Sequence, residues 1–203
     1  LPHLRGNPPP QWFNIDGSFK ADIRWMTDFL PSFNGKRHMK RLPSAPARIK
    51  VDASTKGYAG VCGKHLYYGT FPEFINTQDL HINELEAINC VVAMKMFAPI
   101  IKGTTVELFC DNNVALIAIQ SGKSRNKFIL QCAREIWQVQ QTYNIEIIAL
   151  RISTTDNWLA DRLSRMNQSD KAMKEILDLT DNDKTYNLST PDARLFKLTA
   201  GYV

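Results

Sequence analysis

The sequence predicts an α/β domain with a five-stranded mixed sheet flanked by helices. Three strand-like segments follow one another with short connections, and the later strand-like segments are separated by helical ones. Short connections suit an antiparallel meander, whereas strands joined through helices normally run parallel through right-handed crossovers. The chain has 203 residues, of which 44% are hydrophobic, and this is enough to bury one full core. We therefore expect one principal domain.

The predicted strands are rich in β-branched and aromatic residues and are bounded by glycine or asparagine. They are RIKVDAS (residues 48–54), YAGVCGKHLYYGTF (58–71, predicted to form two strands), TVELFCDN (105–112) and NIEIIALRIS (144–153). The last segment alternates over most of its length, as a half-buried strand does.

The predicted helices carry apolar residues at helical spacing. They are HINELEAINCVVAMKMFA (81–98), SRNKFILQCAREIWQVQQTY (124–143) and DNWLADRLSRM (156–166). The order along the chain is three strands, helix, strand, helix, strand and helix.

Both flanks of this region differ from it in composition. Residues 1–47 contain six prolines outside their first seven residues and one plausible short helix, DIRWMTDFL, which favours a docking segment followed by a linker. Residues 167–203 are polar, with KAMKEILDL as a possible helix and TDNDKTYNLSTPDA as a loop. The predicted division is a connection over 1–47, the main domain over 48–166, and a C-terminal helix and polar tail over 167–203.

The composition indicates a reduced, intracellular protein of the cytoplasm or nucleus. The four cysteines are widely spaced and form no C-x-x-C pair, unlike those of a disulfide scaffold or a zinc site. No apolar run reaches the roughly 18 residues of a membrane span, and no signal peptide is visible. The formal charge of +5 is compatible with a polyanionic partner but does not by itself indicate one. We expect the chain to be part of a longer protein.

Four carboxylates stand at the ends of predicted elements. Asp52 ends the first strand and Asp111 the fourth, and the ends of neighbouring parallel strands meet at one sheet edge. Glu86 on the first long helix and Asp161 in the opening turns of the last helix can reach the same edge. Four gathered carboxylates repel one another unless cations neutralise them. Oxygen ligands favour Mg²⁺ or Mn²⁺, and two such ions about 4 Å apart can cleave a phosphodiester.

Each of these acids also has an ordinary explanation when taken alone. Asp111 before an asparagine suits a turn, Glu86 suits a solvated or salt-bridged helix face, and Asp161 can pair with Arg162 or Arg165. The ordering of strand Asp, helix Glu, strand-end Asp and helix Asp on this layout favours the metal site.

Four stretches surround the four acids: VDASTKGYAGV, INELEAI, LFCDNNVAL and DNWLADRLSR. Because these stretches match its four acidic motifs, residues 48–166 resemble ribonuclease H domains of retroelement reverse transcriptases. Their combination looks most like the ribonuclease H of DIRS-type elements, which use a tyrosine recombinase. The upstream DIRWMTDFLPSFNG is similar to the connection that follows the polymerase thumb in those proteins. The resemblance implies a ribonuclease H-like fold and a polymerase domain in the same polyprotein.

The resemblance also implies roles for individual residues. Asp52, Glu86, Asp111 and Asp161 would be the catalytic acids that bind two Mg²⁺ or Mn²⁺ ions. Asn83 matches an asparagine that touches the minor groove of the hybrid, and Asn112 and Asn113 occupy positions that lie near the nucleic acid. Such polar side chains suit the wide groove in which 2′-hydroxyl groups distinguish RNA from DNA, although simple turn formation also explains the paired asparagines.

Further nucleic-acid contacts are expected from the residue types themselves. Ser54 is small enough to let a sugar-phosphate backbone approach Asp52. In SGKSRNKF, the basic residues Lys123, Arg125 and Lys127 could hold DNA-strand phosphates, and a solvated loop is the alternative.

One departure from the family pattern concerns the loop before the last acid. Many family members carry a histidine there that is thought to assist product release, whereas this loop, RISTTDNW, has none. The departure affects the expected rate and metal preference more than the chemistry, because the metals supply the nucleophile.

The predicted function is metal-dependent endonucleolytic cleavage of the RNA strand of RNA–DNA hybrids during reverse transcription. The alternative is a catalytically decayed connection or scaffold module that binds nucleic acid or partner subunits. The presence of all four acids favours the enzyme. A transposase or integrase of the same fold uses three acids and lacks an equivalent of Glu86.

Overall fold

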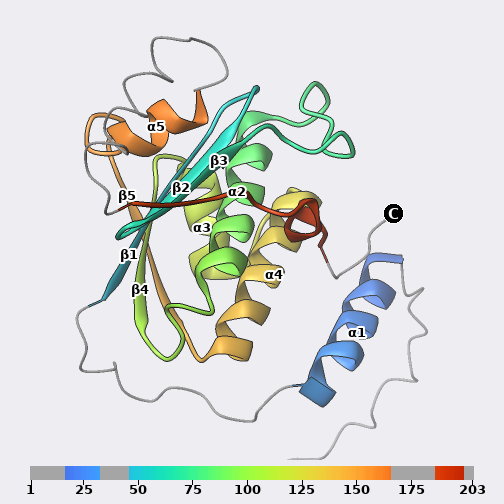
Figure 1. Ribbon diagram of the computed structural model, residues 1–203. Coiled ribbons are helices and arrows are strands. Elements are labelled where there is room, and N and C mark those ends of the chain that lie inside the picture. Colours follow the sequence, from blue (N-terminus) through green and yellow to red (C-terminus); the bar gives the residue numbers. More distant parts are fainter. Residues whose placement is uncertain (1–16, 33–45, 166–185, 199–203) are drawn as a thin grey trace, which may run out of the picture.

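A six-stranded mixed sheet in the order β5-β4-β1-β2-β3-β6 forms the centre of the molecule (Figure 1). The computed structural model describes residues 17–32, 46–165 and 186–198. The strands are β1 (Ala47–Ala53), β2 (Tyr58–Cys62), β3 (His65–Gly69), β4 (Thr105–Cys110), β5 (Glu146–Arg151) and β6 (Asn187–Ser189). Strands β1, β2 and β3 pair antiparallel, while β1, β4 and β5 pair parallel. The predicted mixed sheet is therefore confirmed.

The sheet has one strand more than the five predicted. Strand β6 pairs parallel with β3, and the amide of Asn187 donates to the carbonyl of Lys64 at 2.7 Å. This strand lies in a stretch predicted to be a loop. Its one apolar side chain, Leu188, is 52% exposed, so the strand exists through backbone pairing rather than through a buried face that periodicity could reveal.

The helices of the main domain cover the sheet unequally. They are α2 (Ile82–Phe97), α3 (Asn113–Ser121), α4 (Lys127–Tyr143) and α5 (Trp158–Ser164). Helix α2 packs on β1 and β2 and against α3 and α4, whereas α5 packs on β1, β2 and β3 from the opposite face (Figure 1). Within the described helices, none combines the length and hydrophobicity needed to cross a membrane.

One helix was predicted between the fourth and fifth strands, and the structure has two. Helix α3 begins after Asn112, whose side chain accepts hydrogen bonds from the amides of Val114 and Ala115. It ends at Gly122, which has φ of +66°, a value that glycine adopts without the steric cost of a Cβ atom. The left-handed turn at Gly122 separates α3 from α4.

The main core lies between the sheet and α2, and a smaller one lies beneath α5. Fully buried residues of the main core include Ile49, Val51, Leu85, Ile88 and Leu108. The smaller core consists of Ala59, Leu66 and Leu163, with partly buried neighbours. All four cysteines are free and buried.

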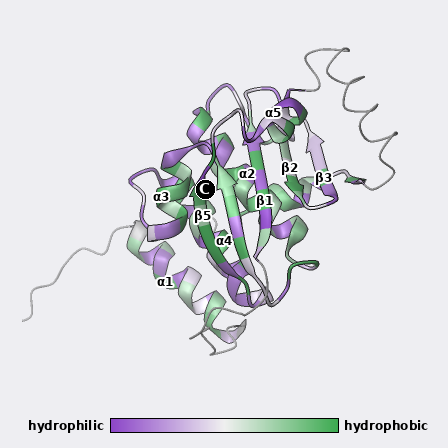
Figure 2. Cartoon of the chain, turned by 90° about the vertical axis from the view of Figure 1, so that its left-hand side faces the viewer, coloured by the Kyte–Doolittle hydropathy of each residue, from purple (hydrophilic) through white to green (hydrophobic). Residues whose placement is uncertain are grey.

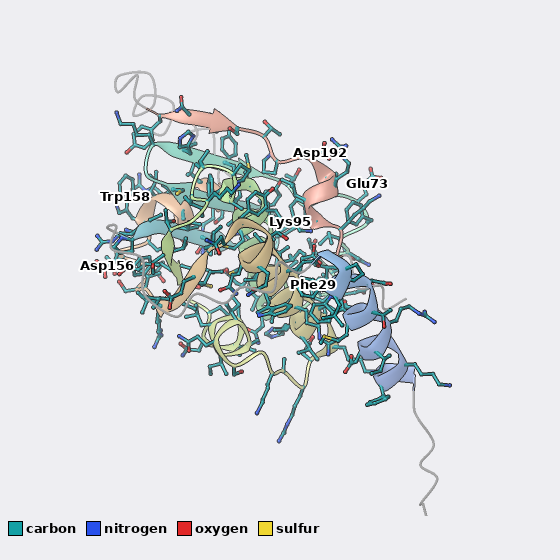
Figure 3. The ribbon with its side chains drawn as sticks, turned by 90° about the horizontal axis from the view of Figure 1, so that it is seen from below. Phe29, Glu73, Lys95, Asp156, Trp158 and Asp192 are labelled. Atoms are coloured by element: carbon teal, nitrogen blue, oxygen red, sulfur yellow. The ribbon has the colours of Figure 1, made fainter. Side chains whose placement is uncertain are left out.

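Helix α1 (Gly17–Phe29), continued by the short helix η1 (Leu30–Ser32), packs against α4. The ring of Phe29 lies 4.7 Å from that of Trp137, and Arg134 pairs with Asp22 at 2.8 Å. Figure 2 shows mixed hydrophilic and hydrophobic residues along α1, and Figure 3 places Phe29 where α1 meets the rest of the molecule. The predicted short helix is thus longer than DIRWMTDFL and begins before it.

The segment 186–198 crosses from β3 to α2 and ends in the short helix η3 (Ala193–Phe196). Phe196 is 2% exposed and its ring lies 4.9 Å from that of Tyr58. The ammonium of Lys95, labelled in Figure 3, donates to the carbonyl of Lys197 at 2.8 Å. Part of the predicted polar tail therefore packs on the core, while the helix predicted over 171–179 lies outside the described residues.

Candidate active site

Asp52 lies at the carboxyl end of β1 and its side chain is almost fully buried, at 3% exposure. The hydroxyl of Ser164 on α5 donates to its Oδ2 across 2.5 Å. Burial raises the pKa of this carboxyl to about 6, although the Ser164 hydrogen bond lowers it, and the charges of Asp161 and Asp111 raise it further. Three of the four predicted acids therefore interact electrostatically.

Glu86 reaches the same sheet edge from α2 and is 2% exposed. Its Oε1 accepts a hydrogen bond from the amide of Ala53 at 3.0 Å, and its Oε2 accepts one from the thiol of Cys110 at 3.5 Å. Its pKa is raised well above the usual value, first by burial and then by the neighbouring Cys110 and Asp52. Glu86 thus bridges the ends of β1 and β4.

Asp111 follows β4 directly and is half-buried. Ligand atoms of Glu86, Cys110 and Asp111 all lie within 4.8 Å of one another, a spacing that one metal ion can span. Asp52 and Asp161 lie outside this three-residue group. Cys110 is therefore a third potential ligand, although the sequence predicted only a buried thiol there. Its position next to Asp111 in the sequence could have indicated this role.

Asp161 lies on α5 and is not among the residues that line the cleft. Its Oδ1 accepts hydrogen bonds from Nε and Nη2 of Arg165 at 2.9 and 2.8 Å. Arg165 is half-exposed and lines the same cleft as Asp52. The pairing of Asp161 with arginine, anticipated as its ordinary explanation, is present together with its proximity to Asp52.

A buried amide network holds the backbone of the candidate site. Asn89 lies one turn after Glu86, is fully buried, and donates to the carbonyls of Asp52 and Ala59 at 2.8 and 2.9 Å. Its Oδ1 accepts from the hydroxyl of Tyr67 at 2.9 Å. This role of Asn89 was not predicted from the sequence. The feature that could have indicated it is a polar asparagine inside the otherwise apolar run INCVVAM.

Asp52, Glu86 and Asp111 line a polar cleft of about 490 Å³. It is lined by Asp52, Ala53, Ser54, Thr55, Lys56, Ile82, Glu86, Asp111, Asn112 and Arg165. Ser54 is only 8% exposed, and its oxygen accepts hydrogen bonds from the amides of Lys56 and Gly57. Gly57 must lack a side chain here, because a Cβ atom would lie 2.5 Å from the carbonyl oxygen of Ser164.

Of the three predicted asparagines, only Asn112 lines the cleft. Asn112 caps α3 and donates from Nδ2 to Oδ1 of Asn83 at 2.7 Å. Asn113 is exposed as the first residue of α3. The amide pair joins the start of α2 to the start of α3 beside Asp111.

The three predicted basic residues are exposed and lie outside the cleft lining: Lys123 and Arg125 on the connection from α3 to α4, and Lys127 as the first residue of α4. Between them, Asn126 caps α4 and donates to Oε1 of Glu84 on α2 at 3.0 Å. This bond anchors the basic connection to the helix that carries Glu86.

The donor set fits divalent cations. Among the described residues, neither Asp52 nor Glu86 forms an ion pair, although both carboxyls are buried. Burial raises the pKa of both; the charges of Asp161 and Asp111 raise that of Asp52 further while Arg165 lowers it, and the charge of Asp52 raises that of Glu86. Such a set is stabilised when a cation replaces the missing positive charge, and carboxylate oxygens suit Mg²⁺ and Mn²⁺. Cleft, donors and charge together make a candidate metal-binding active site.

No protein-family model matches the chain, and no curated protein matches it. Among solved structures, the chain is similar to ribonuclease H1 from the archaeon Halobacterium salinarum, with 11% identity and a TM-score of 0.51 over 62% of this chain and 100% of that one. It is also similar to the N-terminal ribonuclease H domain of a Mycobacterium tuberculosis protein, solved as a fusion with maltose-binding protein, with 13% identity and a TM-score of 0.48 over 66% and 99% of the two chains. The first likeness establishes a ribonuclease H-like fold.

Proposed function

We propose that this chain is a metal-dependent ribonuclease H that hydrolyses the RNA strand of RNA–DNA hybrids. The observation that carries the proposal is the meeting of Asp52 of β1, Glu86 of α2 and Asp111 at the end of β4 in one polar cleft, with Asp161 of α5 close enough for its charge to raise the pKa of Asp52. The ribonuclease H-like fold supports it, since sites in open α/β sheets lie at the carboxyl ends of parallel strands.

The proposed metal ligands are Asp52, Glu86, Asp111 and Asp161. When bound, two Mg²⁺ or Mn²⁺ ions would activate a water molecule and stabilise the leaving oxygen, giving 5′-phosphate and 3′-hydroxyl ends. Ser164 orients the Asp52 carboxylate, and the amide of Ala53 fixes one oxygen of Glu86. Asp161 either breaks its ion pair with Arg165 to bind a metal ion, or binds the ion while this ion pair stays in place.

Substrate contacts are proposed along both sides of these acids. The Asn83–Asn112 pair and the exposed Asn113 offer donors and acceptors to 2′-hydroxyl groups. Lys123, Arg125 and Lys127 offer positive charge to the phosphates of the DNA strand, and Lys56 and Arg165 do so within the cleft. Ser54 contributes by its small size, because its oxygen is engaged in the turn.

The proposed biological setting is template removal during reverse transcription by a DIRS-type retroelement, inside the cell, with a polymerase domain in the same polyprotein. In this setting residues 1–47 form the connection after the polymerase and 167–203 a C-terminal extension. The similarity of the four motifs and of DIRWMTDFLPSFNG to that family supports the setting.

The second candidate is a decayed scaffold module that binds nucleic acid without cutting it. The ion pair between Asp161 and Arg165 favours it, because it occupies one of the four proposed ligands.

The experiment that separates the two incubates the chain with an end-labelled RNA–DNA hybrid in Mg²⁺ or Mn²⁺. We expect cleavage of the RNA strand, loss of cleavage in Asp111→Asn, and retention in Glu107→Gln, whose carboxylate lies on β4 and pairs with Arg48 on β1. Single-stranded RNA and duplex DNA should stay intact. Binding of the hybrid without cleavage would support the scaffold, and equal cutting of all three substrates would contradict hybrid specificity.

A further inference from the structure

Cys110 places a sulfur atom among the carboxylates of the candidate site. It is the last residue of β4, is fully buried, and lies 3.5 Å from Oε2 of Glu86. The amide of Asn112 donates to the same sulfur at 3.4 Å. The hydrogen bond with Cys90 and burial raise the pKa of the Cys110 thiol well above its usual value, although the Asn112 amide lowers it. A cation must therefore displace the thiol proton, because cysteine binds metals as the thiolate.

The distance between the Cys110 sulfur and the Glu86 oxygen matches that between two ligands of a small tetrahedral cation. Bonds of about 2.3 Å to sulfur and about 2.1 Å to a carboxylate oxygen place the two ligand atoms about 3.6 Å apart in a tetrahedron. The Cys110 sulfur and the Glu86 oxygen are 3.5 Å apart, and the group formed with Asp111 stays within 4.8 Å. Asp111 lines the cleft, which provides an entry path and room for a water molecule as fourth ligand.

We infer that Glu86, Cys110 and Asp111 form a binding site for one thiophilic divalent cation such as Zn²⁺ or Cd²⁺. Thiolate selects such ions over Mg²⁺, which prefers oxygen ligands alone. On binding, the Cys110 thiol releases its proton to the buffer and the sulfur donates an electron pair to the cation, without any redox change.

This site deepens the proposed function because it shares Glu86 and Asp111 with the hard-metal ligands. A thiophilic cation held there would exclude Mg²⁺ or Mn²⁺ from those two carboxylates. Only this last consequence rests on the proposed function; the binding itself does not require that the chain cleaves any substrate.

The test is a Cd²⁺ titration of the full metal-free chain, without nucleic acid and with a reductant that contains no thiol. The readout is the ultraviolet charge-transfer absorption of the Cd–thiolate bond. We expect the absorption to saturate at one cation per chain. Cys110→Ser should abolish it and weaken Cd²⁺ binding on the order of 100-fold, whereas the control Cys132→Ser, which removes an equally buried thiol on α4, should retain both.

A second variant, Asp111→Asn, keeps the sulfur and the packing of Cys110 and should weaken Cd²⁺ binding about tenfold or more. Folding of each variant is checked by circular dichroism before titration, and Asp111→Asn alone decides the matter if Cys110→Ser does not fold. Absence of the absorption in the wild type, its persistence in Cys110→Ser, or unchanged affinity in Asp111→Asn would overturn the inference. None of these outcomes depends on hybrid cleavage, so failure here and failure of the proposed function are distinguishable.

Discussion

The hydroxyl of Ser164 donates a hydrogen bond to Oδ2 of Asp52 across 2.5 Å, which joins α5 to β1 inside the candidate site. The same hydroxyl lies 2.9 Å from the carbonyl of Asp161, and the carbonyl of Ser164 accepts from Ser54 at 3.2 Å. Ser164 therefore ties together the two elements that carry Asp52 and Asp161.

Replacing Ser164 by alanine should impair metal activation more than it impairs folding. The variant leaves Asp52 without its side-chain donor, so its carboxylate is less well oriented, and we expect the Mg²⁺ concentration for half-maximal hybrid cleavage to rise about tenfold. Cleavage rates measured across a Mg²⁺ series check this. Ser189→Ala, an exposed serine on β6, is the matched control and should behave as the wild type. If Ser164→Ala needs the same Mg²⁺ concentration as the wild type for half-maximal cleavage, the hydrogen bond from Ser164 does not position Asp52.

The raised pKa of Asp52 should make the metal-free fold less stable as pH rises. The pKa of this carboxyl is about 6 in the folded chain and near its ordinary value of 3.8 in the unfolded chain, so the folded chain binds more protons between these values. The contribution of Asp52 to stability therefore falls as pH increases from about 4 to about 6, by about 3 kcal/mol for two pKa units, and stays low above that window.

Urea unfolding in EDTA at several pH values tests this, with the wild type compared with Asp52→Asn. The asparagine variant lacks this titration, so its stability relative to the wild type should increase across the window. A difference between the two proteins that does not change with pH would contradict the assignment of the shift to Asp52.

Divalent cations should stabilise the fold by relieving repulsion among the acids. A ligand that binds only the folded chain adds about 2.7 kcal/mol at 100 times its dissociation constant. We expect Mg²⁺ or Mn²⁺ to raise the Tm of the wild type and of Glu107→Gln, and to raise that of Asp111→Asn much less. Thermal unfolding with and without EDTA measures the effect. An equal rise in all three proteins would indicate binding elsewhere.

The segment 186–198 should contribute to the stability of the main domain. Phe196 is almost fully buried against Tyr58 and Phe71, so Phe196→Ala should cost about 3 to 5 kcal/mol. Leu188→Ala, in the same segment but 52% exposed, should change stability by about 0.5 kcal/mol or less. Chemical denaturation gives both values, and a small effect of Phe196→Ala would mean that the segment is dispensable for the fold.

Local pattern was enough to predict the mixed sheet and the gathering of three acids. Asp52, Glu86 and Asp111 were predictable because β1 and β4 are parallel neighbours, so their ends meet. Strand β6 was not predictable, because it depends on pairing with β3 across more than a hundred residues of chain. Ser164 and Asn89 were also missed, since their roles arise from contacts with residues remote in sequence, at Asp52 and Ala59. Helix α3 was not predicted as a separate helix, because its apolar stretch is short and the helix ends at Gly122.

The most direct measurement of the central claim compares hybrid cleavage by four single variants, Asp52→Asn, Glu86→Gln, Asp111→Asn and Asp161→Asn, in Mg²⁺. If the acids act as one metal centre, each variant should lose on the order of 1,000-fold in rate while still binding the hybrid. The result that would contradict the claim is an Asp161→Asn protein that cleaves at the wild-type rate, because Asp161 would then serve only its ion pair with Arg165.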